Sequence, residues 1–116
     1  MQITCERRGL TLVARVSGEL DVQTADEFRT TIDAWLGDGP CRRLVLNLSR
    51  VTFLDSTGLG AVLGRLRRVR EAGREMAVVP PTGLGRTLLD TVALGRAVPI
   101  FRSERAALGL EAEADA

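Results

Sequence analysis

The sequence lacks histidine, the residue that most often acts in catalysis or binds metals. Its 116 residues include no histidine, and no GxSxG motif is present to support a serine hydrolase. A serine nucleophile would therefore lack its usual base, and a metal ion would lack its commonest ligand. We expect no catalysis by this chain alone, no metal site and no cofactor.

Cysteines are few and long hydrophobic runs are absent. The two cysteines, Cys5 and Cys41, do not have CxxC spacing, and this usage is typical of a reduced protein. No apolar run approaches the roughly 18 residues that span a bilayer, and Met1 leads into a strand-like pattern instead of a signal peptide. We expect a cytoplasmic protein that does not insert into membranes.

Aromatic side chains and net charge are too sparse to favour nucleic-acid binding. One tryptophan and three phenylalanines provide little stacking surface, and the formal net charge is only +1. Hydrophobic residues make up 45% of the chain and charged residues 27%. This balance is typical of one soluble domain with a modest core.

The first third of the chain predicts a hairpin and a helix. Two β-like runs, Gln2–Arg7 and Leu10–Val16, follow each other closely and predict an antiparallel pair. Residues 18–21 then read as a turn. Thr24–Glu27 has the pattern of a capping box, so we expect a helix that begins near Ala25.

A strand, a turn and a helix in the middle organise the chain. Two apolar runs, Leu44–Leu48 and Val51–Leu54, predict a buried strand, and Asp55–Gly60 predicts a sharp turn into a helix. Ser56 stands where the N-cap of that helix is expected. Five apolar residues of the helix recur at helical spacing and share one buried face: Leu59, Val62, Leu63, Leu66 and Val69.

The opposite face of this helix is rich in glycine. The residues that lie away from the apolar stripe are Gly60, Gly64 and Arg68, flanked by Ala61, Arg67 and Glu71. A glycine inside a helix costs about 1 kcal/mol relative to alanine, and local folding gives no reason to accept that cost. We expect another molecule to approach this flat surface, with Arg67 and Arg68 among its contacts. The alternative is that the arginines of this helix, Arg65, Arg67, Arg68 and Arg70, form a solvated face.

The last third predicts a parallel crossover followed by short elements. Met76–Val79 reads as a strand after the central helix. Thr82 caps a third helix, Val98–Phe101 forms a last strand, and Ser103 caps a final short helix. Residues 111–116 form an acidic tail that we expect to be disordered. The prediction is an α/β fold with a mixed sheet of about five strands and about four helices.

The start of the central helix is a favourable place for an anion. Free N–H groups and the positive end of the helix dipole would stabilise a phosphate carried by Ser56 or Thr57. The alternative is that Ser56 is only a cap and Asp55 only a turn residue. Asp21 also has two interpretations: it holds the backbone N–H groups of its turn, or it contacts a partner near Ser56.

These residues resemble a known family. Leu44–Leu48, followed by Phe-Leu-Asp-Ser-Thr-Gly-Leu-Gly at residues 53–60, resembles the signature of the STAS domain, in particular that of the bacterial anti-sigma factor antagonists. The resemblance continues at residues 18–21, 73–79 and 94–101. It implies one STAS domain over residues 1–110.

The resemblance implies a function and a switch. In that family the serine after the aspartate, here Ser56, is phosphorylated by a partner that is both an anti-sigma factor and a GHKL-type serine kinase. The unmodified form binds this partner and frees a sigma factor, phosphorylation ends the binding, and a phosphatase restores the serine. The residues assigned to partner binding are Asp21, Asp55, Thr57, Gly58, Gly60, Gly64, Arg67 and Arg68.

One departure from the family and two other functions remain open. Asn47 stands where many relatives carry aspartate, so a charge is missing at the end of the strand. One other function is a non-switching scaffold or a regulatory subunit of a transporter or sensory complex, for which the hydroxyl of Ser56 has no use. The other is a nucleotide- or phosphate-binding module in the turn at residues 55–60, although the GxxxxGK[ST] motif and its lysine are absent.

Overall fold

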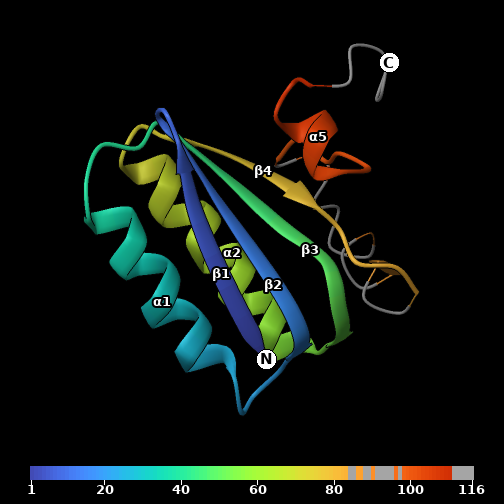
Figure 1. Cartoon of the computed structure of the whole chain (residues 1–116). Coiled ribbons are helices and arrows are strands. Elements are labelled where there is room, and N and C mark those ends of the chain that lie inside the picture. Colours follow the sequence, from blue (N-terminus) through green and yellow to red (C-terminus); the bar gives the residue numbers. More distant parts are fainter. Residues whose placement is uncertain (84–85, 88–89, 91–95, 97, 111–116) are drawn as a thin grey trace.

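A mixed sheet with helices on both faces forms the domain (Figure 1). The computed structural model describes residues 1–83, 86, 87, 90, 96 and 98–110. Within them the strands lie in the order β1-β2-β3-β4. β1 (Gln2–Arg8) and β2 (Thr11–Leu20) are antiparallel, whereas β3 (Arg43–Leu54) and β4 (Glu75–Val79) continue the sheet in parallel. The predicted α/β fold, with a hairpin followed by parallel strands, is confirmed.

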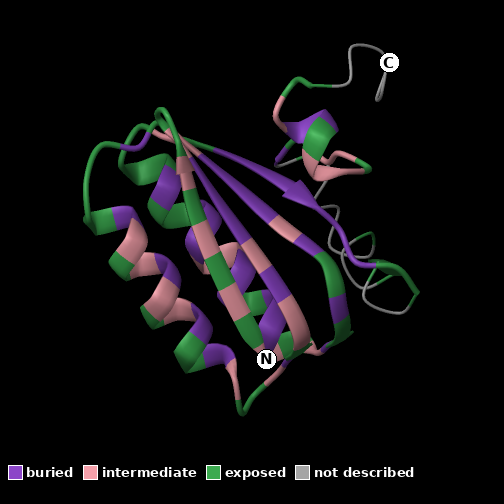
Figure 2. Ribbon diagram, in the orientation of Figure 1, coloured by how far each residue is buried: buried purple, intermediate pink, exposed green. Residues whose placement is uncertain are grey.

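β1 and β2 form the predicted hairpin at one edge of the sheet. Gln2 lies opposite Ser17 and Arg8 opposite Thr11. Gly9 in the turn has a φ of 62°, a conformation that glycine adopts without strain. Half-buried and exposed residues alternate along β1 (Figure 2), because one side of this edge strand faces the core and the other faces solvent.

β2 is longer than the sequence predicts. Residues 18–20, which were expected to form a turn, continue the strand and pair with Val51–Leu54 of β3. The turn prediction is wrong for them because the side chain of Leu20 is fully buried. Gly18, at a φ of 89°, sits where the register shifts, so the strand bends there instead of ending. The turn begins at Asp21.

The β3-α2-β4 unit is the predicted crossover. The two apolar runs form one strand, β3, and α2 (Ser56–Glu71) returns the chain to the start of β4. Four of the five predicted apolar positions of α2 are buried, and Leu63 is half-buried. Gly73, at a φ of 73°, ends the helix and turns the chain into β4.

The sheet separates two groups of buried side chains. One face carries Leu12, Leu44 and Leu46, which pack with α1 (Ala25–Gly37) and α2. The opposite face carries Val13, Val45 and Val79, which pack with α5 (Glu104–Ala107). Successive residues of β2 and β3 therefore point to opposite faces, and both faces are apolar where a helix covers them.

α1 begins at Ala25, as predicted, but the capping box is not formed. The side chain of Thr24 makes no cap hydrogen bond. Its hydroxyl turns back and donates to the carbonyl of Glu19 at 2.8 Å, while the N–H of Asp21 donates to it at 3.0 Å. The capping-box prediction is wrong because the tight turn after β2 uses the same hydroxyl. Trp35 packs half-buried against the core, as expected.

The C-terminal part differs from the prediction in one strand. Val98–Phe101 was expected to form a fifth strand, but it makes only an isolated parallel bridge between Val78 and Ile100. Ser103 caps α5 by accepting from the N–H of Ala106 at 3.1 Å, as predicted. The apolar residues of the predicted third helix (Leu84, Leu88, Leu89 and Val92) and the predicted tail 111–116 lie outside the described residues.

Candidate functional site

Asp55, rather than Ser56, caps α2. Asp55 has extended backbone angles, and its Oδ1 accepts from the N–H of Gly58 at 2.8 Å. Ser56 is the first residue of the helix, so the prediction that it is the N-cap is wrong by one position. A carboxylate accepts this N–H and also interacts favourably with the positive end of the helix dipole. The hydroxyl of Ser56 is therefore not needed as the cap, and Ser56 is exposed.

The same carboxylate fixes the loop between β2 and α1. Its Oδ2 accepts from the N–H of Val22 at 3.3 Å. Asp21 shapes this loop from within, because its Oδ1 accepts from the N–H groups of Gln23 at 2.9 Å and Thr24 at 3.2 Å. The interpretation of Asp21 as a turn residue is confirmed. Asp21 and Asp55 thus build the rim of the surface around Ser56.

The glycines of α2 divide into two kinds. Gly58 is buried, and a Cβ at this position would lie 2.1 Å from the carbonyl oxygen of Leu20. Glycine is therefore required at 58 for the close approach of α2 to β2. A Cβ at Gly60 or Gly64 would meet no atom within 4 Å. The fold does not explain these two glycines, which lie on the outer side of the helix.

The arginines of α2 also differ from one another. Arg67 is exposed, as expected. Arg68 is 63% exposed but lies 3.5 Å from Oδ2 of Asp33 on α1. Arg65 was grouped with a solvated face, and this is wrong: it is 6% exposed, and its Nε lies 3.2 Å from Oδ1 of Asp33. Burial lowers the pKa of Arg65, although Asp33 opposes the shift. Ala61, expected beside the outer face, is buried.

Comparison with known proteins gives the site a family context. The model of the STAS domain matches residues 2–107. An anti-sigma F factor antagonist of Paenibacillus polymyxa is 38% identical over 108 residues, which cover 93% of this chain and 92% of the relative. This chain belongs to the anti-sigma factor antagonist family of STAS domains.

Solved structures of this family have the same fold. The anti-sigma factor antagonist SpoIIAA in its unphosphorylated form superposes with a TM-score of 0.78 at 27% identity, over 93% of this STAS domain and 94% of SpoIIAA. The phosphorylated form of SpoIIAA, from Bacillus, superposes with a TM-score of 0.72 at 27% identity, over 92% and 96% of the two chains. The fold is thus seen in a relative in both phosphorylation states.

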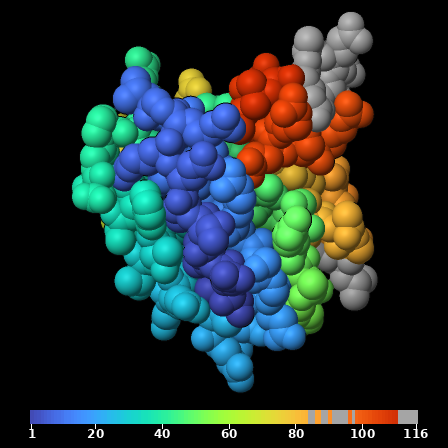
Figure 3. Space-filling model, in the orientation of Figure 1, coloured from blue at the N-terminus to red at the C-terminus, as the bar shows by residue number. Residues whose placement is uncertain are grey.

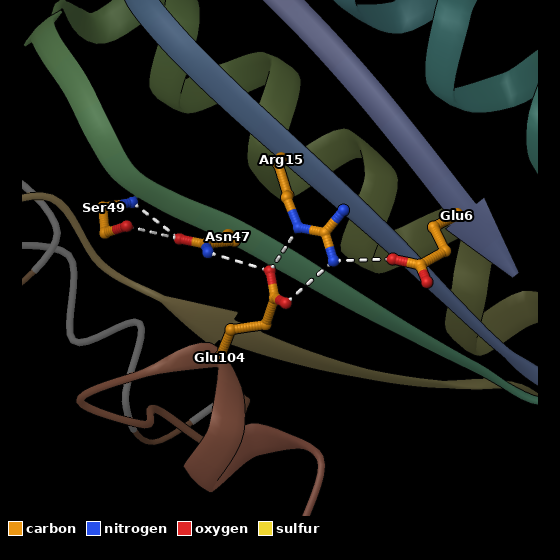
Figure 4. Close-up of polar contacts among 5 residues, drawn as sticks. All are labelled: Glu6, Arg15, Asn47, Ser49 and Glu104. Atoms are coloured by element: carbon orange, nitrogen blue, oxygen red, sulfur yellow. Dashed lines mark hydrogen bonds and ion pairs between the residues drawn. The ribbon is translucent and has the colours of Figure 1, made fainter. Parts of the chain in front are cut away.

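A polar network joins α5 of this STAS domain to the sheet (Figure 4). Arg15 bridges two carboxylates, with Nε 2.8 Å from Glu104 and Nη2 2.7 Å from Glu6. Asn47, the departure from the family pattern, donates to Glu104 at 3.1 Å and accepts from the hydroxyl of Ser49 at 2.7 Å. The side chain of Asn47 therefore bonds to α5 and to Ser49, and not to the turn at Asp55. These contacts hold Glu104 as a carboxylate and lower its pKa.

The same network lines a hollow on the outer side of the sheet, beside the projecting α5 (Figure 3). The hollow has a volume of about 570 Å³, and Arg15, Asn47 and Glu104 are among its lining residues. Because these polar groups bond to each other, we assign them the role of holding α5 in place.

Two structural features are absent from the part of the chain that the structure describes. No group of three or more histidine, cysteine, aspartate or glutamate side chains is arranged to hold a metal ion. None of the described helices has the length and apolar composition required to cross a membrane.

Proposed function

We propose that this protein binds an anti-sigma factor through the outer face of α2 and thereby frees a sigma factor. The observation that carries the proposal is the exposed Ser56 at the start of α2, beside the open backbone at Gly60 and Gly64. Membership of the antagonist family supports a regulator that works by binding and not as an enzyme.

Phosphorylation of Ser56 is the proposed switch. The partner would be a GHKL-type serine kinase as well as an anti-sigma factor, and a separate phosphatase would restore the hydroxyl. Phosphate adds a charge of about −1.5 to −2 at pH 7. At Ser56 this charge would lie next to Asp55 and at the edge of the proposed contact surface. A partner that covers this edge would have to desolvate the phosphate, and binding would weaken.

The assigned residues take different parts in this proposal. Asp21 and Asp55 hold the loop and the helix start that present Ser56. Gly58 lets α2 pack against β2. The proposed contacts are Gly60, Gly64, Arg67 and Arg68, which are open or exposed, together with the half-buried Thr57. Arg68 would meet the partner while it remains paired with Asp33.

Such a switch acts on transcription, and we place the protein in the cytoplasm for that reason. The scaffold and the nucleotide-binding module remain alternatives that the same experiments can detect. A scaffold would bind its partner whether or not Ser56 carries a phosphate. A nucleotide-binding module would bind ATP or GTP in a calorimetric titration of the isolated protein.

The phosphorylation site can be tested directly. The protein would be incubated with ATP and each GHKL-type kinase encoded in the same genome, and its intact mass measured. We expect the mass of one phosphate to be added, and to be missing from Ser56→Ala. Thr57→Ala removes the neighbouring hydroxyl and should still accept one phosphate, even if the loss of a partner contact slows the transfer. Transfer to neither hydroxyl by any such kinase, or transfer to Thr57, would refute the assignment.

The binding face can be tested with a charge of known position. Gly64→Glu places a carboxylate on the outer face of α2 and should abolish capture of the kinase partner without changing the circular dichroism spectrum. Ala34→Glu, at an exposed position of α1, is the control with the same charge and should bind normally. Equal binding by both variants would mean that the partner uses another surface.

A further inference from the structure

A second charged surface lies at the opposite end of α2 from Ser56. Because α2 returns the chain from the end of β3 to the start of β4, its last turn meets the first residues of both strands. A cavity of about 310 Å³ opens there, and Arg43, Arg70 and Arg74 line it. Its volume lies at the lower end of the range of small-molecule sites.

None of these three guanidinium groups is neutralised by a carboxylate of the described chain. Five other described arginines do form an ion pair with a carboxylate, namely Arg15, Arg29, Arg65, Arg68 and Arg86. Arg43 and Arg74 instead donate to the neutral carbonyls of Ala107 and Leu36, which lie outside the lining, and the guanidinium of Arg43 also lies over the ring of Phe101. Those bonds fix the two half-buried side chains in place but leave their charges uncompensated.

The other lining residues of the cavity indicate the charge and polarity of its ligand. Glu75 is the only acidic residue of the lining, so the lining carries two more positive than negative charges. Leu66, Met76 and Pro99 supply an apolar wall beside the arginines. The negative end of the α2 dipole accounts for a positive charge at Arg70, but not at Arg43 and Arg74, which lie outside the helix. Three arginines that line one hollow with an apolar wall match an organic anion instead.

We infer that this cavity binds a small organic anion that carries phosphate or carboxylate groups on a short apolar body. The site is separate from the Ser56 surface and does not depend on the proposed switch. Pyrophosphate and citrate share the charge of such a ligand and distinguish phosphate from carboxylate. Phenyl phosphate, compared with inorganic phosphate, tests the apolar wall.

Each probe would be titrated into ¹⁵N-labelled protein and followed by amide chemical shifts. At least one of pyrophosphate and citrate should give saturable shifts at Arg70, Arg74 and Met76. Loss of one charged hydrogen-bond donor in Arg70→Ala should weaken binding about tenfold. Glu75→Gln, which removes the competing charge at an exposed position, should tighten binding, and Arg50→Ala, an exposed arginine outside the cavity, should not change it.

Three results would overturn the site. Shifts that rise linearly without saturation would show only a general salt effect. Saturable shifts that map to other residues would place the anion elsewhere. Equal affinities of the wild type, Arg70→Ala and Glu75→Gln would exclude the arginine cavity. Phenyl phosphate that binds no more tightly than inorganic phosphate would refute the apolar part of the ligand description.

Discussion

Replacing Gly60 by alanine should stabilise the domain, although this residue lies on the proposed contact surface. A Cβ at Gly60 meets no atom within 4 Å, and the residue is exposed in the first half of α2. The only change in folding is then the better helix propensity of alanine, worth about 1 kcal/mol. For a domain of this size that gain raises Tm by about 4 °C.

Gly58→Ala is the matched control in the same helix. Its Cβ would lie 2.1 Å from the carbonyl oxygen of Leu20, a backbone atom that has no free space to move away. We expect a loss of about 3 kcal/mol, the upper end of the range for overpacking, which lowers Tm by about 12 °C. Urea denaturation and calorimetry of both variants measure the two signs.

The outcome bears on why Gly60 is present. If Gly60→Ala gains stability but loses affinity for the partner, the glycine serves binding at the expense of folding. If Gly60→Ala is destabilised, or if Gly58→Ala is as stable as the wild type, the packing of α2 described above is wrong.

Three other variants test contacts elsewhere in the domain. Arg15, chiefly by hydrogen bonding, lowers the pKa of Glu104. The stability from this contact is therefore present above the ordinary glutamate pKa of 4.5 and is lost as the pH falls through the lowered value. Glu104→Gln should destabilise the protein at pH 7 in urea denaturation, and its difference from the wild type should shrink as the pH falls below 4.5. Asp33→Ala leaves the buried Arg65 without its counterion and should lower the free energy of unfolding by about 3 kcal/mol. The double variant with Arg65→Met should restore most of this loss. An unchanged Tm in the single variant would contradict the pairing. Asp55→Ala removes the cap of α2 and should cost about 1 kcal/mol in thermal unfolding, whereas Asp55→Asn should cost less because it keeps an acceptor.

Much of the fold was predictable because the apolar pattern is regular. The helix at residues 56–71 and the strand before it follow from the spacing of apolar residues alone, and burial in the structure agrees. The errors fall where tertiary contacts override local signals. Glycine at position 18 suggests a turn, yet β3 pairs with this segment and Leu20 is buried, so β2 continues. Thr24 has the sequence of a capping box, but the turn at Asp21 uses its hydroxyl first.

The sequence placed most residues of the candidate site on one helix, but it did not show which of them the fold itself requires. Sequence spacing placed Gly58, Gly60 and Gly64 in one helix. It could not show that only Gly58 packs against the backbone of Leu20. Similarly, Arg65 and Arg67 are both basic residues of this helix. Only the packing of α1 against α2 shows that Arg65 is buried beside Asp33, whereas Arg67 stays exposed.

The energetics of a phosphate at Ser56 indicate where the proposed switch would act. Within the domain, the dipole of α2 would stabilise the phosphate by about 0.3 to 1 kcal/mol. Repulsion between unit charges 4 Å apart in water costs about 1 kcal/mol, so a phosphate of about −1.5 to −2 beside Asp55 would cost about 1.5 to 2 kcal/mol. The net cost is at most about 1.7 kcal/mol, so phosphorylation should lower the Tm of the isolated protein by no more than about 7 °C. A 100-fold loss of affinity needs about 2.7 kcal/mol, and the domain alone cannot supply it. The difference must therefore arise when the partner covers and desolvates the phosphate. A large drop in Tm on phosphorylation, absent from Ser56→Ala treated in the same way, would show instead that the switch acts by loosening the fold.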